Sequence, residues 1–209
     1  GYEMIKHDFS TYDIFGKWGF EMGSSLTKSG WNFRDRSKTT AEIILNLYRT
    51  IREAAGPALV LGCNTVGHLA AGLFELQRTG DDTSGRDWER TRKYGINTLA
   101  FRMPQHGAFF AADADCVGLT KHVPWALTRQ WMELLTSSGT PLFVSISPDA
   151  VGKEQEKALK TAFAAAASER LSAEPLDWFN NTCPSKWLLN GEIRTFDWYG
   201  GIGVYYFET

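Results

Sequence analysis

Apolar runs suited to strands alternate along the chain with segments in which apolar residues recur at helical spacing. Residues 2–7 have the composition of a short strand. The Thr-x-x-Glu pattern at 39–42 predicts a capping box, and the helix that it starts is expected to end at the Gly-Pro pair 56–57. The continuous apolar run at 58–61 is typical of a strand buried on both faces of a parallel sheet.

The same alternation continues through the rest of the chain. The further predicted elements are a strand ending near 76–78, a helical stretch at 88–94, a strand at 109–112, a helix that starts at Pro124, a buried strand at 141–146 and an Ala-, Lys- and Glu-rich helix at 154–168. From about residue 175 the character changes, because Trp residues and the strand-like runs 193–198 and 204–207 predict a small β extension.

The segment from Asp8 to about Arg36 is rich in Gly and aromatic residues. A connection of this length without its own periodicity is uncommon between elements of a compact domain, so we expect it to be a functional loop.

Alternating strands and helices predict an α/β protein, and an open doubly wound sheet and a (β/α)8 barrel both fit the pattern. Two features favour the barrel: no Gly-rich phosphate loop follows a strand, and polar residues stand at the C-terminal end of each one, where barrel enzymes carry their catalytic groups. These residues are Lys6 and Asp8, Cys63 and Asn64, Arg78 and Asp82, and Asp113 and Asp115.

About five strand units are present, whereas a closed barrel needs eight. We therefore expect a partial (β/α)8 TIM barrel, with residues 1–172 forming the C-terminal half of a catalytic barrel and residues 173–209 forming a β-rich C-terminal extension. The opening residues 2–5 have the composition of a strand already in progress, so we interpret the chain as a fragment or a processed piece.

Charge and composition narrow the class of partner. The chain has 209 residues, 22 Lys and Arg against 24 Asp and Glu, and 43% hydrophobic residues, as in ordinary globular proteins. Without a basic cluster, neither nucleic acid nor an anionic membrane is an expected partner, and no apolar stretch of about 18 residues predicts a membrane span. This balance of charges favours a neutral substrate. The cellular compartment stays undetermined, and both a cytoplasmic and an extracytoplasmic location fit the sequence.

Three cysteines are an odd number without zinc-type spacing, so we expect no disulfide framework and no structural metal site. Aromatic residues make up 13% of the chain, and several stand beside polar residues in predicted loops. Sugar-binding clefts use aromatic faces in this way, although packing of loops and core is the more common role for any one ring.

The first candidate for chemistry is the pair Lys6 and Asp8. Side chains two apart on a strand point to the same face, so the ammonium and the carboxylate can share one pocket. A nearby cation lowers the pKa of a carboxyl group and keeps it ionised, as a nucleophile requires. An ordinary ion pair at a strand end is the alternative.

The second candidate is Arg78-x-x-x-Asp82, which supplies a carboxylate at the end of another strand and a guanidinium able to bind two sugar hydroxyls. Two carboxylates across a sugar are what glycoside hydrolysis needs. The neighbouring Asp81 leaves two alternatives open: an Asp that forms a turn, or an Asp-Asp pair that chelates a hard cation.

Weaker candidates are two histidines and a cysteine. His106 and His122 flank the predicted strand at 109–112 and could bind a metal together with Asp113 and Asp115, but they lack the spacing of helix-borne zinc ligands. Cys63 is a conceivable nucleophile, although no His base accompanies it in the sequence.

Together these motifs resemble the melibiase clan of α-galactosidases. IKHDFS (5–10) is similar to that clan's fourth-strand motif, in which Lys, an aromatic residue and the nucleophilic Asp follow one another; His7 stands at the aromatic position. LGCN (61–64) is similar to the fifth-strand segment in which a Cys and an acidic or amide residue line the sugar site. RTGDD (78–82) resembles the sixth-strand Arg-x-x-x-Asp motif, whose Asp is the acid/base.

ADADCVG (112–118) resembles the seventh-strand Asn-Asp-Pro-Asp-Met-Leu motif, with Asp115 at the sugar-contacting Asp and Cys116 in place of Met. TPLFVSIS (140–147) resembles the eighth-strand run. Order and spacing hold from residue 1 to about 150. The clan's first three strands, which carry the Asp pair on the sugar's axial 4-hydroxyl, have no counterpart in this sequence.

The resemblance implies a retaining glycoside hydrolase for terminal α-linked galactose-like sugars that works without a cofactor. Asp8 would form a covalent glycosyl-enzyme, and Asp82 would act as acid and then base, with the two carboxyl groups about 5–5.5 Å apart. The implied sugar-contacting residues are Lys6, Cys63, Asn64, Arg78, Asp115 and Cys116. We expect a homo-oligomer or the missing N-terminal barrel half to cover the open sheet edges.

Two alternatives from other classes remain: a non-catalytic carbohydrate-binding barrel fragment, and a metal-dependent barrel enzyme that uses the aspartate pairs.

Overall fold

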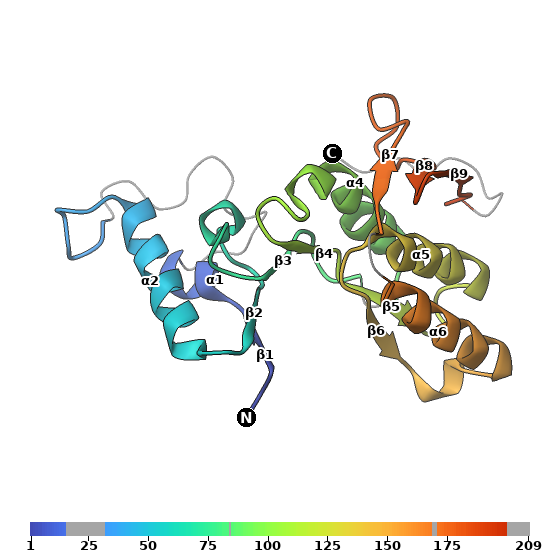
Figure 1. Ribbon diagram of the computed structural model, residues 1–209, viewed down its shortest axis with the longest axis horizontal. Helices are drawn as coiled ribbons and strands as arrows, with labels where there is room; N and C mark the ends of the chain where they lie inside the picture. The colour runs from blue at the N-terminus through green and yellow to red at the C-terminus, as the bar shows by residue number, and fades with distance from the viewer. Residues whose placement is uncertain (16–31, 84, 169–170, 200–209) are drawn as a thin grey trace. The chain divides into compact units, whose positions relative to one another are not determined.

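A computed structural model describes residues 1–15, 32–83, 85–168 and 171–199. The protein is a mixed α/β chain with parallel strands and a C-terminal antiparallel sheet (Figure 1). It divides into two compact units, each described here by itself: unit 1 is Gly1–Arg78 with Gly107–Ala111, and unit 2 is Thr79–His106 with Ala112–Thr209.

Unit 1 is built on parallel strands that follow one another in chain order. Strand β1 (Met4–His7) pairs with β2 (Leu59–Gly62), and β2 pairs with β3 (Leu76–Arg78). Ala111, the first residue of β4 (Ala111–Asp113), donates its N–H to the carbonyl of Glu75, and the sheet order is β1-β2-β3-β4. The strands predicted at 2–7, 58–61 and 76–78 are therefore present.

Helix α2 (Thr40–Ala55) covers this sheet in unit 1 and begins as the sequence predicts. The Thr39 side chain accepts from the N–H of Glu42, and the Glu42 carboxylate accepts from the N–H of Thr39, which completes the capping box. The helix ends at Gly56, whose φ of 58° suits glycine. Its apolar face, with Ile44 and Tyr48, packs in one buried cluster with Val60, Ala70 and Phe74.

The predicted loop from Asp8 to Arg36 contains a short helix at its start. Helix α1 (Ser10–Phe15) directly follows β1, and its first residues Ser10 and Thr11 are buried. Residues 16–31, which make up most of the predicted loop, lie outside the described residues. A 3-10 turn (Gly67–Ala70) lies between β2 and β3.

The helical stretch predicted at 88–94 is the start of a longer helical segment in unit 2. Helix α3 (Trp88–Arg90) is capped by the Asp87 side chain and leads into a π-helix (Thr91–Asn97), then α4 (Thr98–Arg102) and a 3-10 turn (Met103–Gln105). π-helical turns are rare and occur most often near functional sites.

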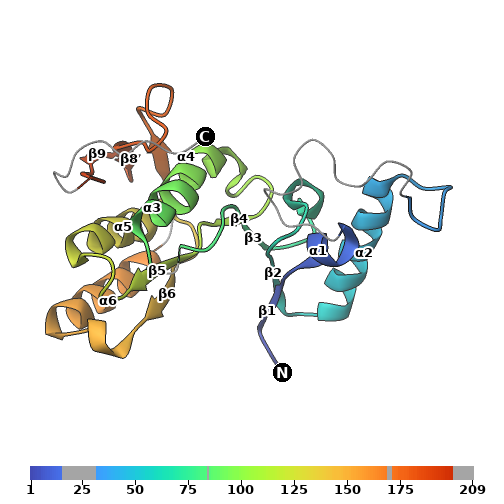
Figure 2. The same ribbon diagram turned by 180° about the vertical axis from the view of Figure 1, so that it is seen from behind.

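Unit 2 contains a second pair of parallel strands, β5 (Cys116–Leu119) and β6 (Phe143–Ile146). Helix α5 (Trp125–Ser138) begins directly after Pro124 as predicted, and α6 (Lys153–Ala166) lies beside it (Figure 2). A 3-10 turn (Pro148–Ala150) joins β6 to α6.

The strand predicted at 109–112 needs a correction. It lies slightly later, as β4, and it is followed after only two intervening residues by a second strand, β5, that the sequence pattern did not predict. Asp115 separates the two strands, because its left-handed backbone (φ 69°) interrupts the run of extended residues.

The predicted β extension is a three-stranded antiparallel sheet in the order β7 (Ala173–Pro175), β8 (Lys186–Leu189) and β9 (Glu192–Thr195). Trp187 and Trp198 are fully buried, and the indole N–H groups of both donate to the carbonyl of Pro184. The run predicted at 204–207 lies outside the described residues.

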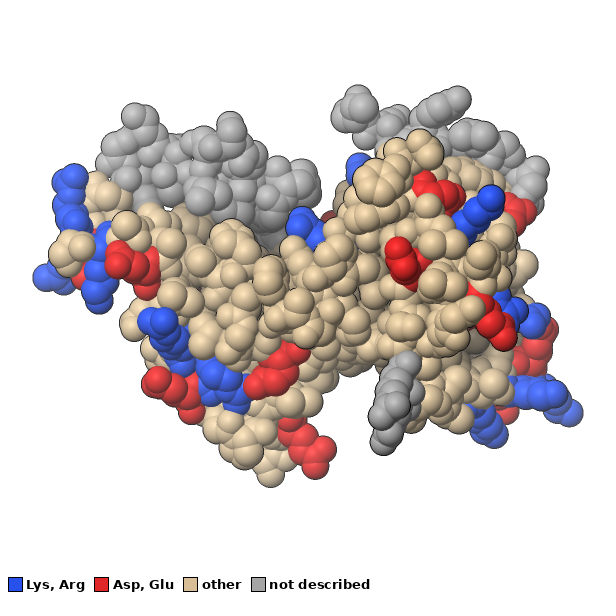
Figure 3. Space-filling view, turned by 45° about the horizontal axis from the view of Figure 1, so that its top comes forward, with Lys and Arg blue, Asp and Glu red and all other residues tan. Residues whose placement is uncertain are grey.

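The surface bears charges of both signs. Lys and Arg are interspersed with Asp and Glu on the face shown in Figure 3. Among the residues that the structure describes, no helix has the length and apolar character needed to cross a membrane.

Candidate active site

The best-defined polar site of unit 1 surrounds Asp8, which follows strand β1. The Lys6 ammonium lies 3.6 Å from Asp8 Oδ2, so the two side chains share one face as their spacing predicts. The Asn64 side-chain amide and the backbone N–H of Phe9 both donate to Asp8 Oδ1 at 2.8 Å. The Cys63 thiol is a further hydrogen-bond partner of the carboxylate. About a quarter of the Asp8 side chain stays exposed, 25%.

These contacts keep Asp8 ionised. Partial burial alone would raise the pKa of the carboxyl group, but the hydrogen bonds from Asn64 and Phe9, the Lys6 charge and the Cys63 thiol outweigh it. The pKa of Asp8 therefore lies below its ordinary value. A carboxylate that is ionised, positioned and open to solvent is suited to nucleophilic attack.

Asn64 is fixed in turn by the chain around it. Its backbone is left-handed, with φ of 47°, a conformation that Asn tolerates better than most residues. Its carbonyl accepts the N–H and the hydroxyl of Thr11, at 3.0 and 2.8 Å. The end of β2 is therefore bonded to the start of α1, directly beyond Asp8.

Cys63 acts here as a hydrogen-bond donor. Burial raises the pKa of its thiol to about 11, although Arg78 and Lys6 lower it in part. The thiol is therefore protonated at neutral pH, which argues against Cys63 as a nucleophile.

His7 points to the other face of β1 from Lys6 and Asp8. Its ring makes edge contacts with Tyr48 and Phe74, at centroid distances of 6.4 and 6.1 Å. Burial lowers its pKa, against the charges of Asp8 and Asp13. His7 thus packs against aromatic residues on the face of β1 opposite Asp8.

In unit 2, Asp82 lies exposed on the segment 79–83, which follows β3. Its N–H donates to Asp81 Oδ1 at 2.7 Å, and its carbonyl accepts from Arg90 Nε at 3.1 Å. Arg90 also pairs with Asp81 at 3.1 Å. The backbone around Asp82 is therefore held by the first turns of the helical segment.

Asp115 and Cys116 hold the far end of the same segment. Asp115 Oδ2 accepts the N–H of Thr83 at 2.6 Å, and the Cys116 carbonyl accepts the Thr83 hydroxyl at 2.7 Å. The Cys116 carbonyl also accepts from the Trp131 indole at 3.2 Å. Asp115 is only 7% exposed, so its carboxylate serves this buried network.

The structure thus gathers the predicted residues into two groups. Unit 1 holds Lys6, Asp8, Cys63, Asn64 and Arg78, and unit 2 holds Asp82, Asp115 and Cys116.

Two residues of the site, Thr83 and Arg90, were missed by sequence reasoning. Thr83 carries no local signal, because its partners are more than thirty positions away in the chain. Arg90 does have one: Asp87 is a helix-capping residue type, which puts Arg90 in the first turn of a helix next to the Asp-Asp pair.

The proposed metal ligands do not gather around a common point. Throughout the described ranges, no group of three or more His, Cys, Asp and Glu side chains is arranged to hold a metal ion. His106 Nδ1 accepts the N–H of Ala112 at 3.1 Å, and burial lowers the pKa of this histidine.

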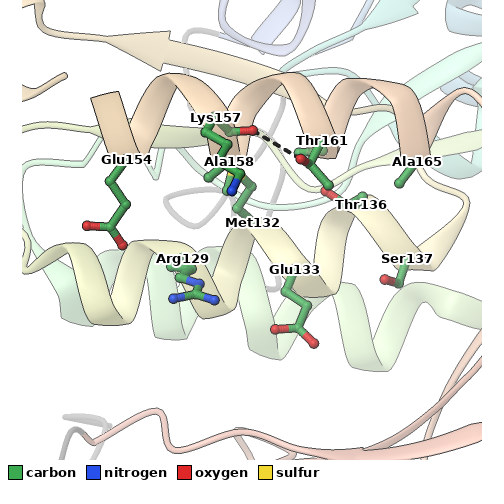
Figure 4. A pocket seen from close by; sticks show the side chains of 11 residues that line it. Arg129, Met132, Glu133, Thr136, Ser137, Glu154, Lys157, Ala158, Thr161 and Ala165 are labelled. Atoms are coloured by element: carbon green, nitrogen blue, oxygen red, sulfur yellow. Dashed lines mark hydrogen bonds between the residues drawn. The ribbon is translucent and has the colours of Figure 1, made fainter. Parts of the chain in front are cut away.

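A groove of about 440 Å³ lies between α5 and α6 in unit 2 (Figure 4). Charged residues of both signs, among them Arg129, Glu133, Glu154 and Lys157, stand along it, and Met132 contributes to its apolar floor. None of the predicted sugar-site residues lines this groove, so we do not assign it to the candidate site.

Comparison with known proteins bears on the fold. No protein-family model matches the chain, and no curated protein sequence does. Solved structures of an α-galactosidase from Thermus thermophilus do match. The complex with p-nitrophenyl α-D-galactopyranoside is 20% identical with a TM-score of 0.58, over 96% of this chain and 38% of that one. The stachyose complex is 20% identical with a TM-score of 0.52, over 78% of this chain and 34% of that one.

The chain therefore spans well under half of the α-galactosidase that it matches. At this identity the likeness concerns the fold alone, and the chain has a distant α-galactosidase-like fold.

Proposed function

We propose that this chain is part of a retaining glycoside hydrolase that cleaves terminal α-linked galactose-like sugars through a covalent intermediate. The observation that carries the proposal is the set of donors around Asp8. Lys6, Asn64, Phe9 and Cys63 keep one solvent-accessible carboxylate ionised, at a strand end of an α-galactosidase-like fold.

In the proposed mechanism, Asp8 attacks the anomeric carbon while the bond to the leaving oxygen breaks, and Asp82 gives that oxygen its proton. Asp82 then takes a proton from water, the water oxygen attacks the anomeric carbon, and Asp8 leaves as a carboxylate. The exposure of Asp82 is compatible with proton exchange. The separation of about 5–5.5 Å that retention requires stays a prediction.

Lys6 and Arg78 are the proposed ligands of sugar hydroxyls, since Lys6 lies beside Asp8 and the charges of both residues act on Cys63. Cys63 and Asn64 bond to the Asp8 carboxylate, and we propose that they serve the sugar site through it. Cys116 stays a proposed lining residue.

The fold proposal is that residues 1–172 form the C-terminal half of a (β/α)8 barrel, with residues 173–209 as a β extension. The chain-order pairing of parallel strands supports it. Among the described strands, β1 pairs with β2 alone and β6 with β5 alone. Met4 and Ile5 on β1 and Ile146 on β6 are exposed to 42, 39 and 46%. We propose that an N-terminal barrel half or a second copy covers these edges.

The first test measures hydrolysis of a panel of p-nitrophenyl α- and β-glycosides by the full-length protein, with proton NMR of the first sugar anomer released. We expect activity on the α-galactoside and release of the α anomer. Release of the β anomer would exclude retention, and a metal-dependent activity would favour the metal-enzyme alternative.

The second test assigns the nucleophile. Asp8→Gly is expected to lower turnover by at least about 10⁴-fold, and added azide should restore it with formation of the β-galactosyl azide. Asp13→Asn, which changes an exposed carboxylate of α1, is the matched control and should keep full activity. Substantial turnover by a folded Asp8→Gly protein without azide would contradict the assignment.

The third test assigns the acid/base. Asp82→Gly should lose most activity on poor leaving groups, keep more on p-nitrophenol, and form the α-galactosyl azide with azide. If Asp82→Gly instead forms the β azide, Asp82 is not the acid/base.

A further inference from the structure

We infer that Asp115 is a positioning residue that holds the segment carrying Asp82 through Thr83, and that it does not contact the sugar. The inference rests on the proposed function for its chemical meaning. Its structural part stands on contacts within unit 2 alone.

The contact between Asp115 and Thr83 is buried on both sides. Thr83 is 1% exposed and Asp115 is 7% exposed, and the backbone N–H of Thr83 donates to Asp115 Oδ2 at 2.6 Å. A hydrogen bond made away from water is electrostatically stronger than one at the surface.

The Thr83 hydroxyl lies between two acceptors. It is 2.7 Å from the Cys116 carbonyl and 3.1 Å from Asp115 Oδ2, and it has one proton to donate. The shorter contact gives that proton to Cys116. The N–H and the hydroxyl of Thr83 therefore bind two successive residues of one segment.

Asp115 is itself held in place by the preceding strand. Its backbone N–H donates to Asp113 Oδ1 at 2.8 Å, and Asp113 is fully buried. The left-handed backbone of Asp115, with φ of 69°, directs the residue out of the line of β4 and β5. Because Asp115 is fixed in this way, it also fixes the position of Thr83, which is bonded to it.

The other end of the Asp82 segment is tied to the same place. The N–H and hydroxyl of Thr79 lie 2.9 and 3.2 Å from the carbonyl of Asp113. Gly80 packs so closely against the carbonyl of Tyr94 that a Cβ would overlap it. Asp81 and Asp82 therefore span a short arch whose two ends rest on residues 113–116.

The bond from the end of this arch to Asp115 limits the role that the Asp115 carboxylate can have. An oxygen already accepting from the buried Thr83 amide sits inside the protein, whereas a sugar-binding carboxylate has to face its ligand. A displacement of about 1 Å in a proton donor can cost about 100-fold in rate. Asp115 thus acts on the reaction by placing Asp82.

The structural test compares Asp115→Asn with Asp115→Gly, because Asn and Gly both accept a left-handed backbone. Asn keeps an acceptor for the Thr83 amide, and Gly removes it. Asp149→Asn, at an exposed ion pair with Lys121 in the same unit, is the control. Hydrogen exchange of the peptide covering 79–83, without substrate, should quicken about 100-fold in the Gly variant and about 10-fold in the Asn variant. Unchanged exchange in both would overturn the inference.

The kinetic test uses the leaving group. For methyl α-galactoside, a poor leaving group, we expect kcat to fall about 100-fold in Asp115→Gly and about 10-fold in Asp115→Asn, with KM nearly unchanged. For p-nitrophenyl α-galactoside, the loss should be under about 10-fold in both. Equal losses for both substrates, or an effect mainly on KM, would indicate sugar contact and overturn the inference.

The two tests separate this inference from the proposed function. Should the wild-type protein hydrolyse no α-galactoside, the proposed function fails, while hydrogen exchange still decides whether Asp115 holds Thr83. The Asn variant keeps the acceptor and the backbone conformation, so the result does not depend on the folding of the Gly variant.

Discussion

In the bonds described above, the protein holds different atoms at Asp8 and at Asp82. At Asp8 it holds the carboxylate: an amide, a backbone N–H, a thiol and an ammonium all approach the two oxygens. At Asp82 the bonds described above reach the backbone, through Asp81 and Arg90, with Thr83 bonded at the next position.

The donors around Asp8 match its proposed role. A nucleophile has to stay ionised, so donors aimed at its oxygens help it. An acid/base has to gain and lose a proton in each cycle, and it also has to be placed against the leaving oxygen. The bonds to the main chain around Asp82 serve that placement.

The largest effect on this comparison is expected from Asn64→Asp, which replaces the amide donor at 2.8 Å from Asp8 with a second carboxylate. The like charge raises the pKa of Asp8 from its lowered value. Activity needs ionised Asp8 and is lost as pH falls through that pKa, so the acid limb of kcat/KM should move to higher pH by about one unit. We also expect about 100-fold lower kcat/KM at pH 7, since the carboxylate is displaced.

The matched control is Asn46→Asp on the exposed side of α2, which adds the same charge. An acid limb that stays in place in Asn64→Asp would mean that Asn64 does not tune Asp8.

Thiol labelling probes the Asp8 surroundings without any substrate. With the Cys63 pKa raised from 9.0 to about 11, its thiolate fraction at pH 8 is about 100-fold smaller than that of an ordinary thiol. Iodoacetamide should therefore modify Cys63 at least about 100-fold more slowly in the folded protein than after unfolding, as followed by mass spectrometry of the peptide. Rapid labelling of folded protein would place Cys63 outside the Asp8 network.

Arg90→Gln tests the bonds that hold the backbone around Asp82. It removes the ion pair to Asp81 and the donor to the Asp82 carbonyl. We expect about 10-fold lower kcat on methyl α-galactoside and an unmoved acid limb, since Asp8 is untouched. Arg129→Gln, an exposed Arg of α5, is the control. A shift of the acid limb by Arg90→Gln would contradict the separation of the two regions.

The smallest expected effect is a change in the free energy of unfolding that leaves kcat unchanged. Thr39→Ala removes the cap of α2 and should lower the free energy of unfolding by about 1 kcal/mol, while kcat stays the same well below the melting temperature. Thr50→Ala, on the exposed surface of the same helix, should change stability less. Chemical denaturation followed by circular dichroism measures both, and equal losses would mean that the cap adds nothing beyond an ordinary exposed Thr.

The sequence predicted those parts of the fold that depend on interactions between residues close together in the chain. The capping box at Thr39 and the proline before α5 act within one helical turn, so the sequence marks both. The break between β4 and β5 was missed because it depends on Asp113 and Thr83 holding Asp115 in a left-handed conformation. Helix α1 was missed for a similar reason, since the Asn64 carbonyl anchors its start.

The candidate site divides in the same way. Strand alternation predicted that Lys6 and Asp8 share a face, and the ion pair agrees. It could not predict that Asn64, which follows β2, reaches Asp8, or that Thr83 binds Asp115, because those contacts join residues far apart in the chain.

Left-handed residues stand beside both carboxylate networks: Asn64 next to Asp8 and Asp115 next to Thr83. Only Gly, Asn and Asp adopt this backbone readily. If selection acted on folding alone, Gly, Asn and Asp would replace one another at positions 64 and 115. Selection for turnover would instead retain the amide at position 64 and the carboxylate at position 115. The amino acids tolerated at these two positions would therefore distinguish selection for activity from selection for folding.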